Sequence, residues 1–199
     1  MARDRFFRVV PAAWLAVVLL APAGASAEPR RFTIDPEHFH LGFAATHIGY
    51  ADVLGLFLEG GGSFVYDEEA RALSDLRVTV EAASVFTNHD KRDGHLRSKD
   101  FLAAGAHPEI TFVMTGAEPA SETAGTVTGD LTLRGQTHPV TLEVVLNKAG
   151  TYPYNDNYVL GISARTVIER SRWGMTYAVE NGWVADAIPI TIEIEAIRE

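Results

Sequence analysis

The chain of 199 residues contains no cysteine. This absence excludes a disulfide framework, a thiolate metal site, a cysteine nucleophile and a lipid anchor on an N-terminal cysteine. Basic residues are also scarce, because 17 Lys and Arg stand against 26 Asp and Glu and give a formal net charge of -9. A nucleic-acid-binding protein needs clustered Lys and Arg to neutralise phosphates, so this balance argues against nucleic acid as a partner.

The sequence has no long apolar run either. The apolar stretch at residues 12–21 is too short and ends too abruptly for a convincing membrane span. Three arginines precede it and small residues follow it at 25–27, which is the order of parts in a secretory signal peptide. We predict a signal peptide over residues 1–27, cut after Ala27, with a retained N-terminal anchor as the alternative.

The predicted mature chain, residues 28–199, is more acidic than the whole sequence. It holds 14 Lys and Arg and 25 Asp and Glu, which gives a net charge of -11. Export without disulfides is typical of a bacterial envelope or secreted protein whose stability comes from its core. A chain of this length forms one ordinary globular domain, so we expect a single domain over 28–199, in the periplasm or the medium.

Apolar and polar residues alternate with a period of two over most of the mature chain, which is typical of strands with one buried face. The clearest case is the alternation of isoleucines with polar residues over 188–195. Gly60-Gly61-Gly62 interrupts another such pattern and predicts a hairpin or a bulged bend. The alternating segments are 39–45, 54–58, 64–66, 76–80, 110–114, 126–134, 140–147, 158–169 and 188–195.

A sheet with one apolar face must bury that face, either by closing on itself or by packing against a second sheet. The loops are mostly short, which favours sequential hairpins, and closure removes exposed edges. We therefore predict an all-β fold, an extended antiparallel up-and-down β-barrel of about eight strands. A barrel of this size is filled by side chains or holds one small ligand.

One charged segment, NHDKRDGHLRSKDFL at 88–102, breaks the strand pattern. We predict a loop followed by a short helix, a helical insertion around 90–102 that covers one mouth of the barrel. Functional residues concentrate on segments of this kind. The alternative is a solvated connector held by its own salt bridges.

The seven histidines form no recognisable metal motif. His38 and His40 share a strand face, and His89, His95 and His107 surround the charged segment. Metal sites need three or four converging ligands, and no HExxH or related pattern is present, so we predict no metal. The sequence also lacks a GxSxG elbow and a phosphate-binding glycine loop, so we predict no cofactor and no catalytic activity.

Several motifs match a known family in order and spacing. They are Asp35 three residues before His38, RDGHLRSKDFL at 92–102, HPEITF at 107–112, GDLTLRGQTHPVTLEV at 129–144 and ERSRWGM at 169–175. With them, the chain resembles the YceI-like, polyisoprenoid-binding proteins of bacteria over essentially all of residues 32–198. The resemblance implies a lipocalin-like barrel with a long apolar channel for an isoprenoid or fatty-acyl chain. It also implies binding, storage or transport of isoprenoid lipids such as quinones or prenyl pyrophosphates in the envelope.

On this interpretation the barrel interior is a container for a long-chain amphiphilic lipid. The predicted channel wall consists of inward-facing strand residues, namely Phe43, Phe64, Phe112, Leu133, Leu142, Ile162 and Ile190. The predicted mouth, near the lipid head group, consists of His47, Arg92, His95, Arg97, Trp173 and Met175. Arg92 and Asp93 could instead form a structural ion pair. The net charge of -11 mildly favours a quinone-like head group over a pyrophosphate.

Two other classes of function stay open on the sequence alone. The first is an enzyme that acts on a lipid held in the barrel, and the second is a structural or stress-related interaction module with a filled interior. Transient membrane contact is left open, as is a homodimer formed through exposed valines such as Val145.

Overall fold

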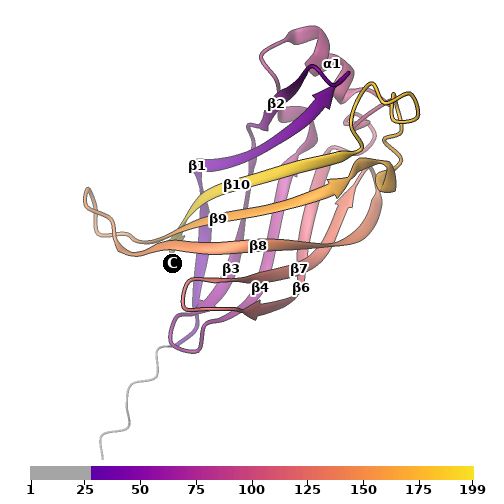
Figure 1. Ribbon diagram of the computed structural model, residues 1–199. Helices are drawn as coiled ribbons and strands as arrows, with labels where there is room; N and C mark the ends of the chain where they lie inside the picture. Colours follow the sequence, from indigo (N-terminus) through magenta and orange to yellow (C-terminus); the bar gives the residue numbers. More distant parts are fainter. Residues whose placement is uncertain (1–27) are drawn as a thin grey trace, which may run out of the picture.

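A computed structural model describes residues 28–199, and the predicted signal peptide, residues 1–27, lies outside the described residues. The described chain forms a closed antiparallel barrel of eight strands (Figure 1). Its strands are β1 (Arg30–His47), β2 (Ala51–Phe57), β3 (Gly60–Asp67), β4 (Ala72–Glu81), β5 (Val85–Phe86), β6 (Glu109–Pro119), β7 (Ala124–Leu133), β8 (Gln136–Thr151), β9 (Tyr158–Glu169) and β10 (Ala187–Arg198). The remaining elements are the helix α1 (Asp90–Arg97) and the 3-10 turns η1 (Ala82–Ser84) and η2 (Arg170–Trp173).

The barrel closes because β1 pairs with β10, the last strand of the chain. From β6 to β10 every strand pairs with its neighbours in sequence. The ten strand segments occupy eight positions in the wall. β2 and β3 share one position, since both run antiparallel to β1, β2 along residues 41–47 and β3 along residues 30–33. β4 and β5 share the next, since β4 pairs with β3 and β5 pairs with β2. This arrangement confirms the predicted up-and-down barrel.

The three glycines at 60–62 do not form a hairpin. β2 and β3 run in the same direction along β1, the interruption between them lies at residues 58–59, and the glycines belong to β3. Gly60 and Gly62 are needed for close packing, because a Cβ atom at Gly60 would lie 2.5 Å from the Phe39 ring and one at Gly62 would lie 2.2 Å from the carbonyl oxygen of Arg77, whereas a Cβ at Gly61 would meet open space. The predicted hairpin is wrong. The alternative, a bulged bend, is closer to the structure, because the register between β3 and β4 shifts between Ser63 and Val65.

A bulge in β1 accompanies the interruption between β2 and β3. Ile34 pairs with Ala196 of β10, whereas Phe39 pairs with Ile194, so residues 35–38 stand opposite one residue of β10 and the β1 side has three additional residues. Such a bulge bends a strand and changes which residues face inward. The side chains of Phe32 and Ile34 are buried before the bulge, and Phe39 is buried after it.

Residues 87–89 connect β5 to helix α1, which confirms the predicted helical insertion. The helix ends at Arg97, and turns over residues 98–106 follow it. The His89 side chain caps the helix by accepting a hydrogen bond from the amide of Arg92 at 3.3 Å. The turns bring the buried Phe101 and Leu102 to the barrel. Figure 1 shows α1 at the end of the barrel where β1 and β2 are joined.

The opposite end of the barrel is closed by large side chains. Phe32 is fully buried and stacks on Phe64, with 5.5 Å between the ring centroids. The Tyr158 hydroxyl donates to a carboxylate oxygen of Glu68 at 2.7 Å, and the Arg198 guanidinium lies over the Tyr158 ring. No helix within residues 28–199 is long and apolar enough to cross a membrane.

Candidate functional site: an apolar cavity and its mouth

The barrel encloses a cavity of about 500 Å³. This volume falls within the range of roughly 300–1,000 Å³ that is usual for small-molecule sites. The walls are almost entirely apolar and come from the inward faces of the barrel strands. All of the predicted channel residues lie on this lining, namely Phe43, Phe64, Phe112, Leu133, Leu142, Ile162 and Ile190. Their contact with a lipid stays a prediction.

The cavity reaches solvent at the end that carries α1. The lining residues with exposed side chains are His47, Ile48, Tyr177 and Trp183, and we call this set the mouth. They come from the end of β1, from the turn that follows it and from the segment between η2 and β10. The backbone joins the two sides, since the amide of Ile48 donates to the carbonyl oxygen of Trp183 at 2.7 Å.

A buried arginine holds one side of the mouth in place. Arg170 donates hydrogen bonds to four backbone carbonyls, those of Met175 (2.6 Å), Tyr177 (2.9 Å), Val184 (2.9 Å) and Ala185 (2.9 Å). Burial lowers the pKa of Arg170, and the nearby Asp186 opposes this shift. The guanidinium group also lies 5.5 Å from the centroid of the Phe101 ring. Arg170 therefore fixes the segment 175–185.

On the other side of the mouth, Arg92 and Asp93 both bind Thr87. Asp93 is buried and accepts hydrogen bonds from the amide of Thr87 at 2.8 Å and from its hydroxyl. Arg92 donates to the hydroxyl of Thr87 at 2.7 Å and to its carbonyl oxygen at 2.6 Å. Burial acts to raise the pKa of Asp93, but the bonds from Thr87 and the charges of Arg97 and Arg92 lower it below its ordinary value. A shared partner thus takes the place of the direct ion pair considered from the sequence.

His95 connects α1 to the mouth. Its ring meets the rings of Phe101 and Tyr177 edge-on, with centroid distances of 5.0 and 4.9 Å. Its Nε2 lies 3.2 Å from a carboxylate oxygen of Asp100. The helix and the segment 175–185 are therefore linked through aromatic contacts beside the cavity opening.

The residues predicted for the mouth divide into two groups. His47, Arg92, His95 and Met175 line the cavity, whereas Arg97 and Trp173 do not. The Arg97 guanidinium donates to the carbonyl oxygens of Ala83 and Val85 at 2.7 and 2.9 Å, on the outer side of α1. Trp173 is fully buried, and its indole Nε1 donates to the carbonyl oxygen of Leu131 at 3.2 Å. Both residues support the wall from behind.

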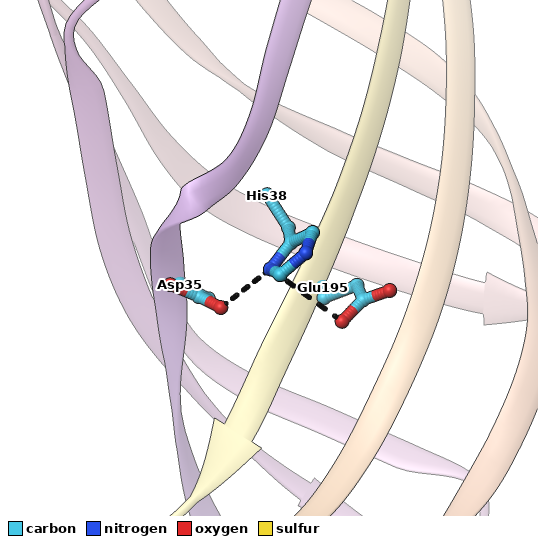
Figure 2. Close-up of side chains that lie close together, drawn as sticks. All are labelled: Asp35, His38 and Glu195. Carbon is cyan, nitrogen blue, oxygen red and sulfur yellow. Dashed lines mark hydrogen bonds and ion pairs between the residues drawn. The ribbon is translucent and has the colours of Figure 1, made fainter. Parts of the chain in front are cut away.

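A second polar cluster lies on the outer wall, at the β1 bulge (Figure 2). His38 Nδ1 is 2.7 Å from Asp35 Oδ2 and 3.7 Å from Glu195 Oε2 of β10. The hydrogen bond to Asp35 raises the pKa of His38, and the same bond lowers the pKa of Asp35. The atoms of these three side chains that could ligate a metal lie within 4.8 Å of one another. Because Nδ1 of His38 is engaged with Asp35, we interpret the cluster as a set of contacts that holds the β1 bulge in its conformation. We call these three residues the bulge lock.

Some residues of the site were missed by sequence reasoning. Arg170 stands two residues after Ile168, in the inward register of β9, so strand parity could have placed it inside the barrel. Tyr177 and Trp183 lie in a segment without periodicity, and no sequence signal places them beside the cavity. Ile48 occupies a turn and gave no signal either.

Comparison with known proteins identifies the family. The model of the YceI-like domain matches residues 32–196. A UPF0312 protein of Yersinia enterocolitica is 36% identical over 186 residues, which cover 92% of this chain and 95% of the relative. A UPF0312 protein of Pectobacterium carotovorum is 34% identical over 185 residues, which cover 92% and 94%.

Solved structures share the fold. The Campylobacter jejuni YCEI protein is similar with a TM-score of 0.71 and 27% identity, over 77% of this chain and 90% of that one. BcnA of Burkholderia cenocepacia has a TM-score of 0.71 at 21% identity, over 81% and 98%. A polyisoprenoid-binding domain from Saccharophagus degradans has a TM-score of 0.62 at 11% identity, over 86% and 100%. The family match over 32–196 confirms the resemblance found in the sequence, and the chain belongs to the family of YceI-like domain proteins.

Proposed function

We propose that the protein binds an isoprenoid or another long-chain lipid in its barrel, and that it transports, stores or sequesters this lipid in the bacterial envelope. The proposal rests on the apolar cavity of about 500 Å³, whose exposed lining residues lie together at one end of the barrel. The structural neighbour from Saccharophagus degradans, named as polyisoprenoid-binding, supports the class of ligand. The envelope location rests on the signal peptide expected over residues 1–27.

The energetics suit reversible transfer. Each methylene group removed from water gains about 0.8 kcal/mol, so a long prenyl tail does not cross an aqueous compartment unaided. A bilayer offers the tail a similar gain. The cavity therefore needs only to match the bilayer for a lipid to enter and leave, and an interior lined by aliphatic and aromatic side chains provides such a match.

The polar lining residues favour a weakly charged head group. The Arg170 guanidinium is engaged with backbone carbonyls, and that of Arg92 with Thr87. His47 and His95 remain as polar side chains on the lining at this end. A pyrophosphate would need free arginines and would be repelled by the net charge of -11. We therefore favour a quinone-like or alcohol head group, and binding rather than catalysis.

Native mass spectrometry of the full chain expressed with its leader and purified from a bacterial periplasm tests this proposal. We expect the protein to carry one lipid per barrel, and solvent extraction should identify it. Protein emptied by extraction should take up a fluorescent farnesol analogue from octyl glucoside micelles. A protein that carries no lipid and takes up none from micelles would refute the proposal.

A further inference from the structure

Beyond Asp52, which accepts a hydrogen bond from the Thr46 hydroxyl, the outer face of β2 is apolar although it faces solvent. Along this strand Val53, Gly55 and Phe57 point inward, while Leu54 and Leu56 point outward. Leu54 is 71% exposed. Ordinary barrel strands place polar residues on their outer face, as β10 does with Thr191, Glu193 and Glu195. We call the exposed set on and beside β2 the apolar rim, and it consists of Tyr50, Leu54, Leu56, Leu58 and Phe86.

The apolar rim is continuous with the mouth of the cavity. Tyr50, which is 89% exposed, belongs to the turn that also carries the mouth residue Ile48. Phe86 pairs with Leu56 across β5 and β2, which extends the surface toward α1. Figure 1 shows β2 and α1 at the same end of the barrel. Exposed apolar patches that adjoin a binding site mark surfaces of interaction.

The backbone beneath the rim allows it to be flat. On the outer face of β1, Gly42 pairs with Leu56 and Ala44 pairs with Leu54. The β1 positions beside the two leucines therefore carry no bulky side chain. The apolar atoms of the rim can therefore meet a planar partner without hindrance from β1.

Charge is distributed in favour of the same end. The mouth end holds 7 of the 14 Lys and Arg of residues 28–199 but only 9 of the 25 Asp and Glu. It is formed by the segments 46–59, 81–107, 134–138 and 169–187. Most of the acidic excess thus lies on the other parts of the barrel. The mouth end therefore repels the phosphates of phospholipid head groups less than the other parts of the barrel do.

We propose that the apolar rim docks on the surface of a lipid bilayer and holds the mouth against it, so that a lipid tail passes between bilayer and cavity without crossing water. This inference rests on the proposed function. Trp and Tyr are the residues preferred at a membrane interface, and Trp183 and Tyr50 stand at the mouth and the rim. A protein seated on the same surface, including a second copy of this chain, would cover the mouth and block exchange.

A triple variant, Tyr50→Ser with Leu54→Ser and Leu58→Ser, tests the docking surface, because none of the three residues lines the cavity. The matched control is Tyr154→Ser with Val167→Ser and Val145→Ser, at exposed apolar residues outside the rim. Tyr154, at 88% exposure, matches Tyr50 and lies in the β8–β9 connection at the far end. Both variants change three exposed apolar side chains to serine.

The measurement is the rate at which each emptied protein takes up a fluorescent farnesol analogue from phosphatidylcholine vesicles and from octyl glucoside micelles. We expect the rim variant to be at least about tenfold slower than wild type from vesicles and equal to it from micelles, with the control equal in both. Equal rates from vesicles for all three proteins would overturn the docking surface.

Sedimentation equilibrium tests whether a second copy of this chain, rather than a bilayer, occupies the apolar rim. A wild-type dimer that the rim variant converts to a monomer would also overturn the proposal and assign the rim to contacts between copies. Failure of wild-type uptake from both micelles and vesicles would instead refute lipid binding itself. Uptake from micelles together with unchanged vesicle rates in the rim variant leaves lipid binding intact and refutes docking alone.

Discussion

The ring of Phe43 lies directly over Gly55, its partner on the neighbouring strand. A Cβ atom at Gly55 would stand 2.2 Å from Cζ of Phe43. The absence of a side chain on β2 therefore lets the ring lie flat against the wall, where it lines the cavity beside Phe57 at a centroid distance of 5.8 Å. Aromatic rings that cover a glycine on the next strand are a recognised device for shaping barrels.

We predict that Gly55→Ala displaces the Phe43 ring into the cavity and lowers the free energy of unfolding by about 1–3 kcal/mol, as overpacking does elsewhere. Urea denaturation measures this loss. Gly42→Ala is the control, because a Cβ there would meet Leu56 Cδ2 at 3.6 Å, an ordinary contact. It should be neutral or stabilising by up to about 1 kcal/mol. Equal effects of the two substitutions would show that Phe43 does not depend on Gly55.

Arg170 should determine the order of the segment 175–185. We predict that Arg170→Gln removes at least about 3 kcal/mol of stability, since four backbone carbonyls lose a charged donor. Limited proteolysis should then cut within this segment. Arg170→Lys keeps the charge but cannot reach all four carbonyls and should be cut too. Arg165→Gln, at an exposed position of β9, is the control. Resistance of the Arg170 variants equal to that of the control would contradict this role.

The bulge lock predicts a dependence on pH. Asp35 raises the pKa of His38 above its ordinary 6.5. The stabilising contribution of protonated His38 is therefore fully present below pH 6.5 and is lost as pH rises through the raised pKa of the folded protein. The pKa of Asp35 is lowered below 3.8, so its contribution is lost as pH falls through that lowered value. The pair of His38 and Asp35 therefore stabilises the folded protein most between pH 3.8 and pH 6.5.

His38→Gln should consequently lower the free energy of unfolding more at about pH 5.5 than at about pH 9, as measured by urea denaturation at both. His40→Gln, a neighbouring exposed histidine of β1, controls for the general loss of a surface imidazole. The same loss at both pH values in His38→Gln would mean that protonation of the pair contributes nothing to holding the bulge.

Strand parity explains why the channel wall and His47 could be predicted, whereas Ile48, Tyr177 and Trp183 of the mouth could not. In a closed barrel every inward position faces one interior, so the alternation that turns Ile190 inward also places it on the cavity. Parity fails for α1, where Arg92 and Arg97 face different ways according to how the helix sits on β5. The alternation also changes phase between Ile34 and Phe39, and that change marks the bulge in hindsight.

Ala164→Phe tests the central claim that the barrel is a container. Ala164 is buried on the lining at the middle of β9, and Val145→Phe places the same ring on the outer wall as a control. If the interior is a cavity, the introduced ring fills part of it, stability stays the same or rises by about 0.5–2 kcal/mol, and lipid bound per barrel falls in native mass spectrometry. An unchanged amount of bound lipid together with a loss of about 1–3 kcal/mol from overpacking would show a solid core and contradict the account.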